Sequence, residues 1–144
     1  MLHDQEEEHD CFSDNTHNSH FYDVVGIRSI YLGEYHRSDG TVVRGPSLSD
    51  FVRHAVPALD RDMRARLDAT LAAFQAIKTR AETIEAYDQM LGEGNTEGNA
   101  LVQATIDRLL EQTRTIERIM AALRLSASFE RSDSLDNQSA VRRP

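Results

Sequence analysis

Apolar residues in the second half of the chain recur every three or four positions, in two long runs. The first run extends from Ala58 to about Leu91, and the second begins near Asn95 or Thr96 and ends near Leu125. Positions three and four apart lie on one face of an α-helix, so each run predicts a long helix with one buried face. The link between them has only about four residues, which predicts antiparallel neighbours.

The two predicted helices each carry a single apolar stripe. The stripe of the first consists of Leu59, Met63, Leu67, Thr70, Leu71, Phe74, Ile77, Ala81, Ile84 and Leu91. That of the second alternates steps of four and three, typical of helices packed at a shallow angle; it consists of Val102, Ile106, Leu109, Thr113, Ile116, Met120 and Leu123. Gly92 is predicted to adopt the left-handed conformation that ends the first helix. Asn95 or Thr96 is expected to cap the second.

A shorter helix is predicted from about His17 or Asn18. Apolar residues share one face of it and continue toward the next segment: Phe21, Val24, Val25, Tyr31, Leu32 and Tyr35. Gly26 lies inside this helix, where glycine costs about 1 kcal/mol relative to alanine. Its presence there predicts close packing against a neighbouring element.

An irregular insertion is predicted at residues 36–57. Asp39-Gly40 is a tight-turn signal, so a short hairpin between 30–35 and 41–44 is one alternative to a loop. After it, Ser47 is predicted to cap a short helix with Asp50 reciprocating. The apolar side of that helix would be Phe51, Val52 and Val56, and Pro57 would end it or start the next one.

These elements predict an all-α fold, an up-down helical bundle of about four helices with two long antiparallel helices. Two stripes bury each other only partly, so the shorter helix and the start of the chain must cover the rest. Residues 1–130 are expected to form one helical domain. Residues 131–144 are expected to form a polar, partly disordered tail.

Composition narrows the classes of function. The net charge is −8, and an acidic surface repels phosphate backbones, which argues against nucleic acid as a partner. No apolar run approaches the roughly 18 residues that span a bilayer. The acidic start, Met1 to Glu8, does not match a secretory signal. Cys11 is the single cysteine, which rules out an intrachain disulfide.

The first twenty residues concentrate side chains that can bind metals. They hold 4 of the 6 histidines: His3, His9, His17 and His20. Imidazole commonly binds first-row transition metals, and carboxylates bind harder cations or iron. His17 and His20 are three apart and would share a helix face. Two ligands do not make a site, and a third would come from His9, Asp10, Asp14 or another element.

The same stretch also has a purely structural interpretation. Asp14 and Asn15 are residue types that cap a following helix and bond nearby backbone amides. No Cys-x-x-Cys or His-Glu-x-x-His pattern is present, so the common zinc signatures are missing. The spacing alone leaves capping and metal binding both open.

The run from Asp4 to Asn18 resembles the central motif of imelysin-like proteins, the family of insulin-cleaving membrane protease and iron-regulated protein. Further segments that resemble the family follow in its order, at 26–33, 39–40, 45–50, 57–60, 92–99 and 129–137. The family hallmark, Gly-x-His-x-x-Glu, lies in an N-terminal half that this sequence does not contain. His3-Asp4-Gln5-Glu6 has no preceding glycine, so the hallmark is not carried onto it.

The resemblance implies the C-terminal helical half of a bacterial periplasmic or outer-membrane envelope protein linked to iron uptake. A missing N-terminal helical bundle would be its partner, and iron or another divalent metal, or an iron-bearing ligand, would be bound between them. In that cleft the resemblance implies His9, Asp14 and His17 as metal ligands, with Asn15 and Thr16 lining it. No catalytic residue is assigned.

Two rival functions remain. Some imelysin-like proteins are classed as metallopeptidases, which need a metal-activated water and a general base at an open coordination position. The sequence supplies no complete set of these groups, so this chain alone is expected to lack peptidase activity. The other rival is an interaction module that binds no metal.

Overall fold

The structure, a computed structural model, describes residues 8–125. Its elements in chain order are a 3-10 turn Cys11–Ser13, α1 Thr16–Leu32, β1 Glu34–His36, β2 Val42–Arg44, α2 Leu48–Ala55, α3 Pro57–Thr83, α4 Tyr87–Leu91 and α5 Thr96–Ala122. Three long helices and two short ones confirm the predicted all-α bundle. The predicted tail, 131–144, lies outside the described residues. In the described part, no helix is both long and apolar enough to cross a membrane.

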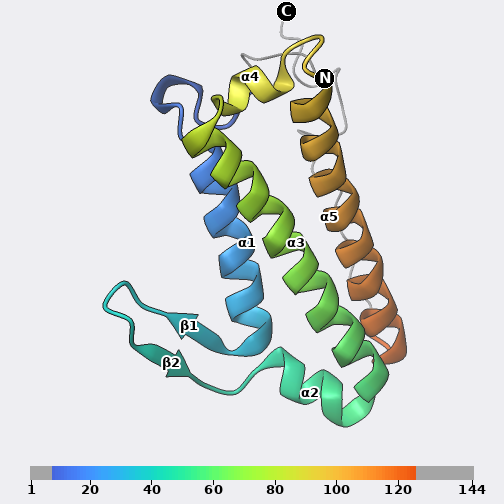
Figure 1. Cartoon of the computed structure of the whole chain (residues 1–144). Coiled ribbons are helices and arrows are strands. Elements are labelled where there is room, and N and C mark those ends of the chain that lie inside the picture. Colours follow the sequence, from blue (N-terminus) through green and yellow to red (C-terminus); the bar gives the residue numbers. More distant parts are fainter. Residues whose placement is uncertain (1–7, 126–144) are drawn as a thin grey trace, which may run out of the picture.

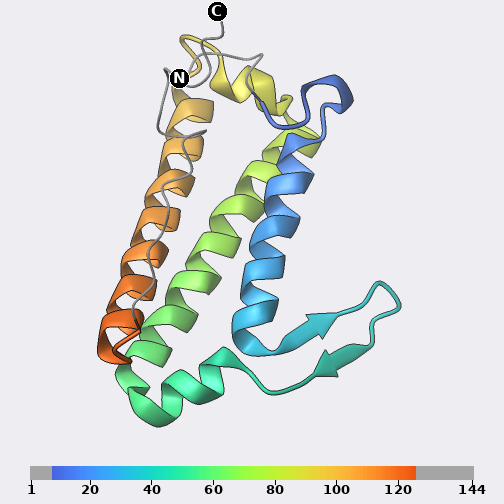
Figure 2. The ribbon, with the colours of Figure 1, turned by 180° about the vertical axis from the view of Figure 1, so that it is seen from behind.

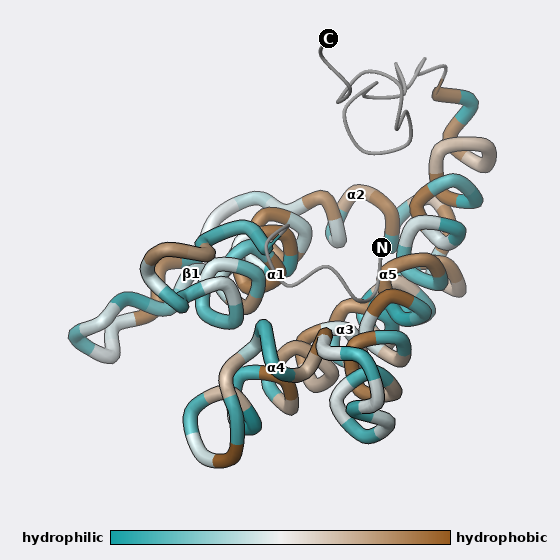
Figure 3. Tube along the Cα trace, turned by 90° about the horizontal axis from the view of Figure 1, so that it is seen from above, coloured by the Kyte–Doolittle hydropathy of each residue, from teal (hydrophilic) through white to brown (hydrophobic). Residues whose placement is uncertain are grey.

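The three long helices run down, up and down in the view of Figure 1, with α3 between α1 and α5 (Figures 1 and 2). Helices α3 and α5 are the predicted antiparallel pair. Ion pairs cross their interface, from Arg66 Nη1 to Glu111 Oε2 at 2.7 Å and from Arg118 Nη1 to Asp62 Oδ2 at 2.7 Å. Seen end-on, α1 and α5 lie on different sides of α3 (Figure 3). The three long helices therefore form one layer with α3 in the middle.

The apolar core lies along α3 in two clusters. The cluster near α2 joins α1, α2, α3 and α5 through Tyr31, Val52, Leu59, Met63, Leu67 and Ile119. The cluster at the other end joins α3, α4 and α5 through Ile77, Met90 and Val102. The predicted stripe of the first long helix contributes to both clusters, with Leu59, Met63 and Leu67 in one and Ile77 in the other, because residues three and four apart share one face of the helix.

The insertion contains the hairpin that the sequence left as an alternative. Strands β1 and β2 pair antiparallel, with Tyr35 opposite Val43. Gly33 ends α1 in the left-handed conformation, with φ +63°. A Cβ there would lie 2.7 Å from the carbonyl oxygen of Gly45, so this tight corner requires glycine.

Local helix signals were predicted correctly. The Ser47 Oγ accepts a 2.9 Å hydrogen bond from the Asp50 amide and donates to the Asp50 carboxylate at 2.7 Å. Asn95 caps α5 by accepting from the Gly98 amide at 2.9 Å. Pro57 occupies the first turn of α3, where its missing N–H costs nothing.

The prediction of one continuous helix to Leu91 is wrong. Helix α3 ends at Thr83, and Ile84, a predicted core residue, is 68% exposed. The chain then turns into the separate helix α4. Met90 of α4 lies in the core, where it is fully buried beside Ile77 and Val102.

Polar contacts hold this turn. Glu85 accepts from Arg80 Nε at 2.5 Å and from Asn95 Nδ2 at 2.8 Å, so its carboxylate ties the end of α3 to the start of α5. The prediction for Gly92 is also wrong. Gly92 has φ −55°, and the left-handed residue of this link is Gly94, with φ +85°.

The predicted stripe of α5 is partly wrong. Val102 is buried as predicted, but Ile106 and Thr113 are exposed, and the other buried positions are Gly98, Thr105, Gln112, Thr115 and Ile119. The threonines can be buried because Thr105 Oγ1 donates to the Leu101 carbonyl at 2.9 Å and Thr115 Oγ1 donates to that of Glu111 at 3.3 Å. The face that α5 buries therefore differs from the face that its apolar residues alone predict.

Two further expectations fail. A Cβ on Gly26 would meet nothing within 4 Å, so this glycine does not mark close packing. Phe51 was predicted on the apolar side of α2, yet it is exposed, and so is Tyr35 in β1. Their exposure follows from the open faces of the layer, where no described element covers them.

A buried polar network joins α1, α2 and α3. Asp60 is only 2% exposed, and its Oδ1 accepts from Tyr31 Oη at 3.0 Å and from Ser49 Oγ at 2.5 Å. Arg64 Nε donates to Asp60 Oδ2 at 3.2 Å and to Ser49 Oγ at 3.0 Å. Burial raises the pKa of Tyr31 well above its ordinary value, and the hydrogen bond to the negatively charged Asp60 raises it further. The Asp60 carboxylate bonds only to side chains of α1, α2 and α3. We therefore interpret the network as one that fixes these three helices relative to one another.

Candidate functional site

The N-terminal polar stretch folds into a turn held against the start of α1. Asp14 adopts the left-handed conformation, with φ 49°, and this reverses the chain after Cys11–Ser13. The Asp10 amide then donates to Thr16 Oγ1 at 2.9 Å, and Thr16 is fully buried. Thr16 therefore acts as an internal anchor for the turn.

Asp10 also bonds through its side chain. Its carboxylate accepts a hydrogen bond from the hydroxyl of Ser19, one turn into α1. The carbonyl of Asp10 accepts from the Ser13 amide at 3.1 Å. Because backbone and side chain of Asp10 are both held, the residue before it is fixed over the same face of α1.

That residue is His9, and it lies beside His20. Their ring centroids are 5.7 Å apart. The His20 ring also meets Phe74 of α3 at 6.2 Å and Tyr87 of α4 at 6.0 Å, both edge-on. His20 thus contacts aromatic rings of α3 and α4 as well as the exposed ring of His9.

Burial and neighbouring charges shift the pKa of two groups in this cluster, His20 and Tyr87. Burial and the neighbouring His9 lower the pKa of His20, while Asp23 and Asp10 oppose that shift. Burial, and then the Glu8 carboxylate, raise the pKa of Tyr87. The His20 ring therefore favours its neutral form, in which one ring nitrogen carries a lone pair.

A polar hollow of about 600 Å³ opens next to His9. It is lined by His9, Asn15, Asn18, Ser19, Tyr22 and Asp23. Asn18 is held in place because its Nδ2 donates to Asn15 Oδ1 at 2.9 Å and its Oδ1 accepts from Lys78 Nζ at 2.6 Å. The hollow therefore offers imidazole, amide, hydroxyl and carboxylate groups on a rigid helix start.

The predicted site residues separate in the structure. His9 and Asn15 line the hollow, whereas Thr16 is buried beneath the turn. Asp14 is exposed at the reversal of the chain. His17 is half-buried, with Nε2 3.1 Å from Asn18 Nδ2 and with its buried Nδ1 lacking a hydrogen-bond partner. His9, Asp14 and His17 as a ligand set remain a prediction.

Sequence reasoning missed the pairing of His9 with His20. The available signal was the spacing of His17 and His20 on a helix, which indicated a different pair. Pairing His9 with His20 depends on the left-handed Asp14 and on the bond between Asp10 and Thr16. Neither has a sequence pattern of its own. Within residues 8–125, no group of three or more His, Cys, Asp or Glu side chains is arranged to hold a metal ion.

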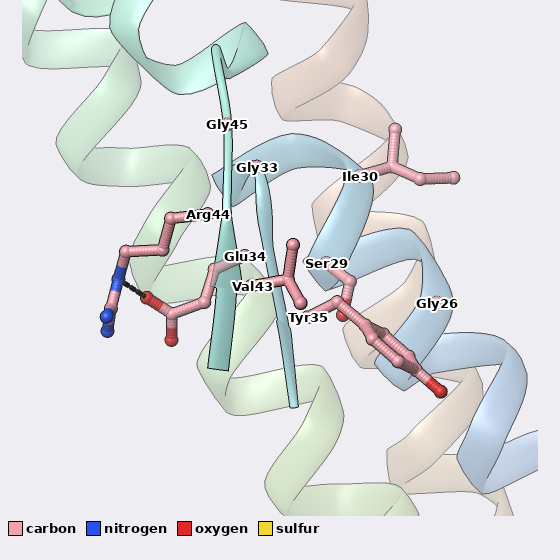
Figure 4. A pocket seen from close by; sticks show the side chains of 9 residues that line it. All are labelled: Gly26, Ser29, Ile30, Gly33, Glu34, Tyr35, Val43, Arg44 and Gly45. Atoms are coloured by element: carbon pink, nitrogen blue, oxygen red, sulfur yellow. Dashed lines mark hydrogen bonds and ion pairs between the residues drawn. The ribbon is translucent and has the colours of Figure 1, made fainter. Parts of the chain in front are cut away.

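A second hollow, of about 420 Å³, lies between α1 and the hairpin (Figure 4). Tyr35 and Val43 extend toward α1 beside Gly26, and the ion pair of Arg44 Nε with Glu34 Oε2, at 2.8 Å, lies on the other side of the hairpin. Its lining is mainly apolar and supplies no cluster of metal ligands, so the hollow beside His9 is the better candidate.

The lowered pKa of His20 predicts acid sensitivity of the metal-free protein. A histidine that resists protonation in the folded state contributes stability at high pH. That contribution is lost as the pH falls through the unfolded value of about 6.5. We expect the free energy of unfolding, measured by urea denaturation, to fall more between pH 7.5 and 5.5 in the wild type than in His20→Phe, which keeps a ring against Phe74 and Tyr87.

His54 on α2 offers a control, since it is an exposed histidine in a different element. The His54→Asn variant should keep the full pH dependence of the wild type. A His20→Phe variant whose pH dependence equals that of the wild type would show that His20 contributes nothing to it.

The chain was compared with known proteins. A family model, described as imelysin, matches residues 1–116. A search of curated protein sequences finds no match. The matched range includes every described element from the Cys11–Ser13 turn to α4, and most of α5.

Proposed function

This chain belongs to the imelysin family, and we propose that it supplies part of a site that binds iron or another divalent metal for uptake at the bacterial cell envelope. Family membership supports a metal-related or peptidase-like role. The observation that carries the proposal is the His9–His20 pair, of which His9 lines a polar hollow at the start of α1.

The spacing of the pair fits two ligands of one metal. Imidazole nitrogens bind zinc at about 2.0–2.1 Å, which puts a metal about 3 Å from each ring centroid and the two centroids at most about 6 Å apart. The centroids of His9 and His20 are 5.7 Å apart. Imidazole suits iron, zinc, copper and nickel alike, so the chemistry of the pair is compatible with the proposed metal.

The pair also has the support that metal-binding histidines need. His20 is oriented by Phe74 and Tyr87, and His9 follows from the fixed position of Asp10. A bound divalent metal would act as a Lewis acid or as cargo. The remaining ligands would come from outside residues 8–125, from the metal-bearing ligand or from the N-terminal bundle that the family resemblance implies.

The test is metal binding by the whole chain, measured by calorimetry with Zn²⁺, Cu²⁺ and, without oxygen, Fe²⁺. We expect one weak site per chain. His9→Ala and His20→Ala should each lower the affinity by about tenfold or more, the scale on which metal sites respond to lost supporting residues. His54→Ala removes an exposed histidine elsewhere and should leave the affinity unchanged.

Two further variants separate the pair from the predicted set. If Asp14→Asn and His17→Ala weaken binding as much as His9→Ala while His20→Ala does not, then His9, Asp14 and His17 are the ligands. Equal binding by the wild type and by all four variants would remove the metal proposal and favour an interaction module. Turnover of a peptide substrate, abolished by a chelator and by His9→Ala, would favour the metallopeptidase.

A further inference from the structure

An apolar groove of about 350 Å³ lies on the face of the layer at the end of the bundle that holds α2. Its walls come from α1, α2 and α5, and Met63 of α3 contributes to its lining. Several of its large apolar side chains are exposed, among them Ile30, Leu48 and Phe51. Large apolar side chains gathered in one groove mark a surface that another segment covers.

The end of α5 directs the chain into this groove. Arg124 adopts the left-handed conformation, with φ 54°, and the Leu125 amide donates to the Met120 carbonyl at 2.9 Å. This is the geometry of a Schellman motif, in which the residue after the left-handed one contacts the helix apolarly. Leu125 and Met120 accordingly both line the groove. The chain therefore leaves α5 at the wall of the groove.

The sequence that follows contains Phe129, Leu135 and Val141 as its aromatic or branched aliphatic residues. Residues 126–144 are mostly polar or small, and Phe129 and Leu135 come four and ten positions after Leu125. Four extended residues span about 13 Å, so Phe129 can reach the groove without any change in α5. A segment tethered at the groove wall also meets it at a high effective concentration.

We propose that the segment 126–144 of the same chain covers this groove, with Phe129 as its anchor between α1, α2 and α5. The segment forms an intramolecular strap over the open end of the layer. This surface is separate from the hollow beside His9, and the proposal does not depend on metal binding.

The sequence contains no tryptophan, so Phe129→Trp places a single fluorescent reporter in the strap. In the whole chain we expect its emission to be blue-shifted, and its quenching by acrylamide to be lower, than in the same protein unfolded in urea. Both properties should be independent of protein concentration, because the groove and the strap belong to one chain.

A matched pair of groove variants completes the test. Leu48 lines the groove and is 54% exposed, while Leu110 of α5 lies outside it and is 50% exposed. In the Phe129→Trp background, Leu48→Glu should shift the emission to the unfolded value, and Leu110→Glu should leave it unchanged. Far-UV circular dichroism checks that both fold, and Ile30→Glu is a second groove variant should Leu48→Glu fail to fold.

Three results would overturn the proposal. The first is solvent-like emission from Phe129→Trp in the folded chain. The second is a blue shift that Leu48→Glu and Ile30→Glu both leave intact. The third is a blue shift that grows with protein concentration, since it would assign the groove to a second copy of the chain.

Discussion

Replacing Asp60 with alanine is expected to lower the free energy of unfolding by about 3 kcal/mol, because it leaves buried donors without an acceptor. Tyr31 and Ser49 donate to this carboxylate from α1 and α2, and both are buried. Arg64 loses its carboxylate partner but keeps its hydrogen bond to Ser49, and its side chain is partly exposed and can be hydrated, which reduces its share of the cost. The measurement is urea denaturation followed by far-UV circular dichroism.

Asp68→Ala is the matched control. It removes the same type of side chain from the same helix, but Asp68 is exposed and pairs with Arg28 at the surface. Exposed ion pairs contribute about 0–1 kcal/mol, so the variant should unfold within that range of the wild type. Equal denaturation midpoints for Asp60→Ala and the wild type would show that the network adds no stability. Asp60→Asn should cost less, since its amide oxygen can still accept from Tyr31 and Ser49.

The difference between Asp60 and Asp68 illustrates what the sequence alone can predict. Both are acids on an amphipathic helix, and their spacing assigns neither to the core. Asp60 is buried because α1 and α2 bring Tyr31 and Ser49 to it from elsewhere in the chain. The pattern of α3 predicts which apolar residues face inward, but tertiary contacts decide which polar residue joins them.

Local features of the fold were predictable because they depend on residues a few positions apart. The caps at Ser47 and Asn95 and the first turn at Pro57 are such cases. The break in the helix after Thr83 was not predictable, since it depends on a hydrogen bond between Glu85 and Asn95 across a turn. The face that α5 buries was not predictable either, because a threonine that is buried by bonding to its own helix does not appear in an apolar pattern.

The candidate site follows the same rule. The family match to residues 1–116 confirms the resemblance that pointed to the N-terminal stretch, and that stretch as the site remains a prediction. The sequence did not indicate that His9 would lie beside His20, since that contact requires the chain reversal at Asp14 and the hydrogen bond from the Asp10 amide to Thr16. Composition thus indicated which residue types gather in this stretch, but it did not indicate the contact partners of each side chain.

Two glycine-to-alanine substitutions should change stability in opposite directions. Gly98 lies in the first turn of α5, and a Cβ there would be 2.7 Å from the Met90 Cα and 2.8 Å from its carbonyl oxygen. These are backbone atoms, so α4 must move away from α5. Overpacking of this kind costs about 1–3 kcal/mol. The gain in helix propensity, at most about 1 kcal/mol, does not offset a cost at the upper end of that range.

Gly26 provides the comparison in α1, since a Cβ there meets nothing within 4 Å. Gly26→Ala should therefore raise the free energy of unfolding by about 0.5–1 kcal/mol, through the lower entropy of the unfolded chain and better helix propensity. Gly98→Ala should lower it by about 2 kcal/mol, and it should also disturb His20, because α4 carries Tyr87 against that ring. Urea denaturation measures the first effect, and the NMR chemical shifts of the His20 ring measure the second. A Gly98→Ala variant as stable as Gly26→Ala, with unchanged His20 shifts, would show that the contact between α4 and α5 is looser than these distances require.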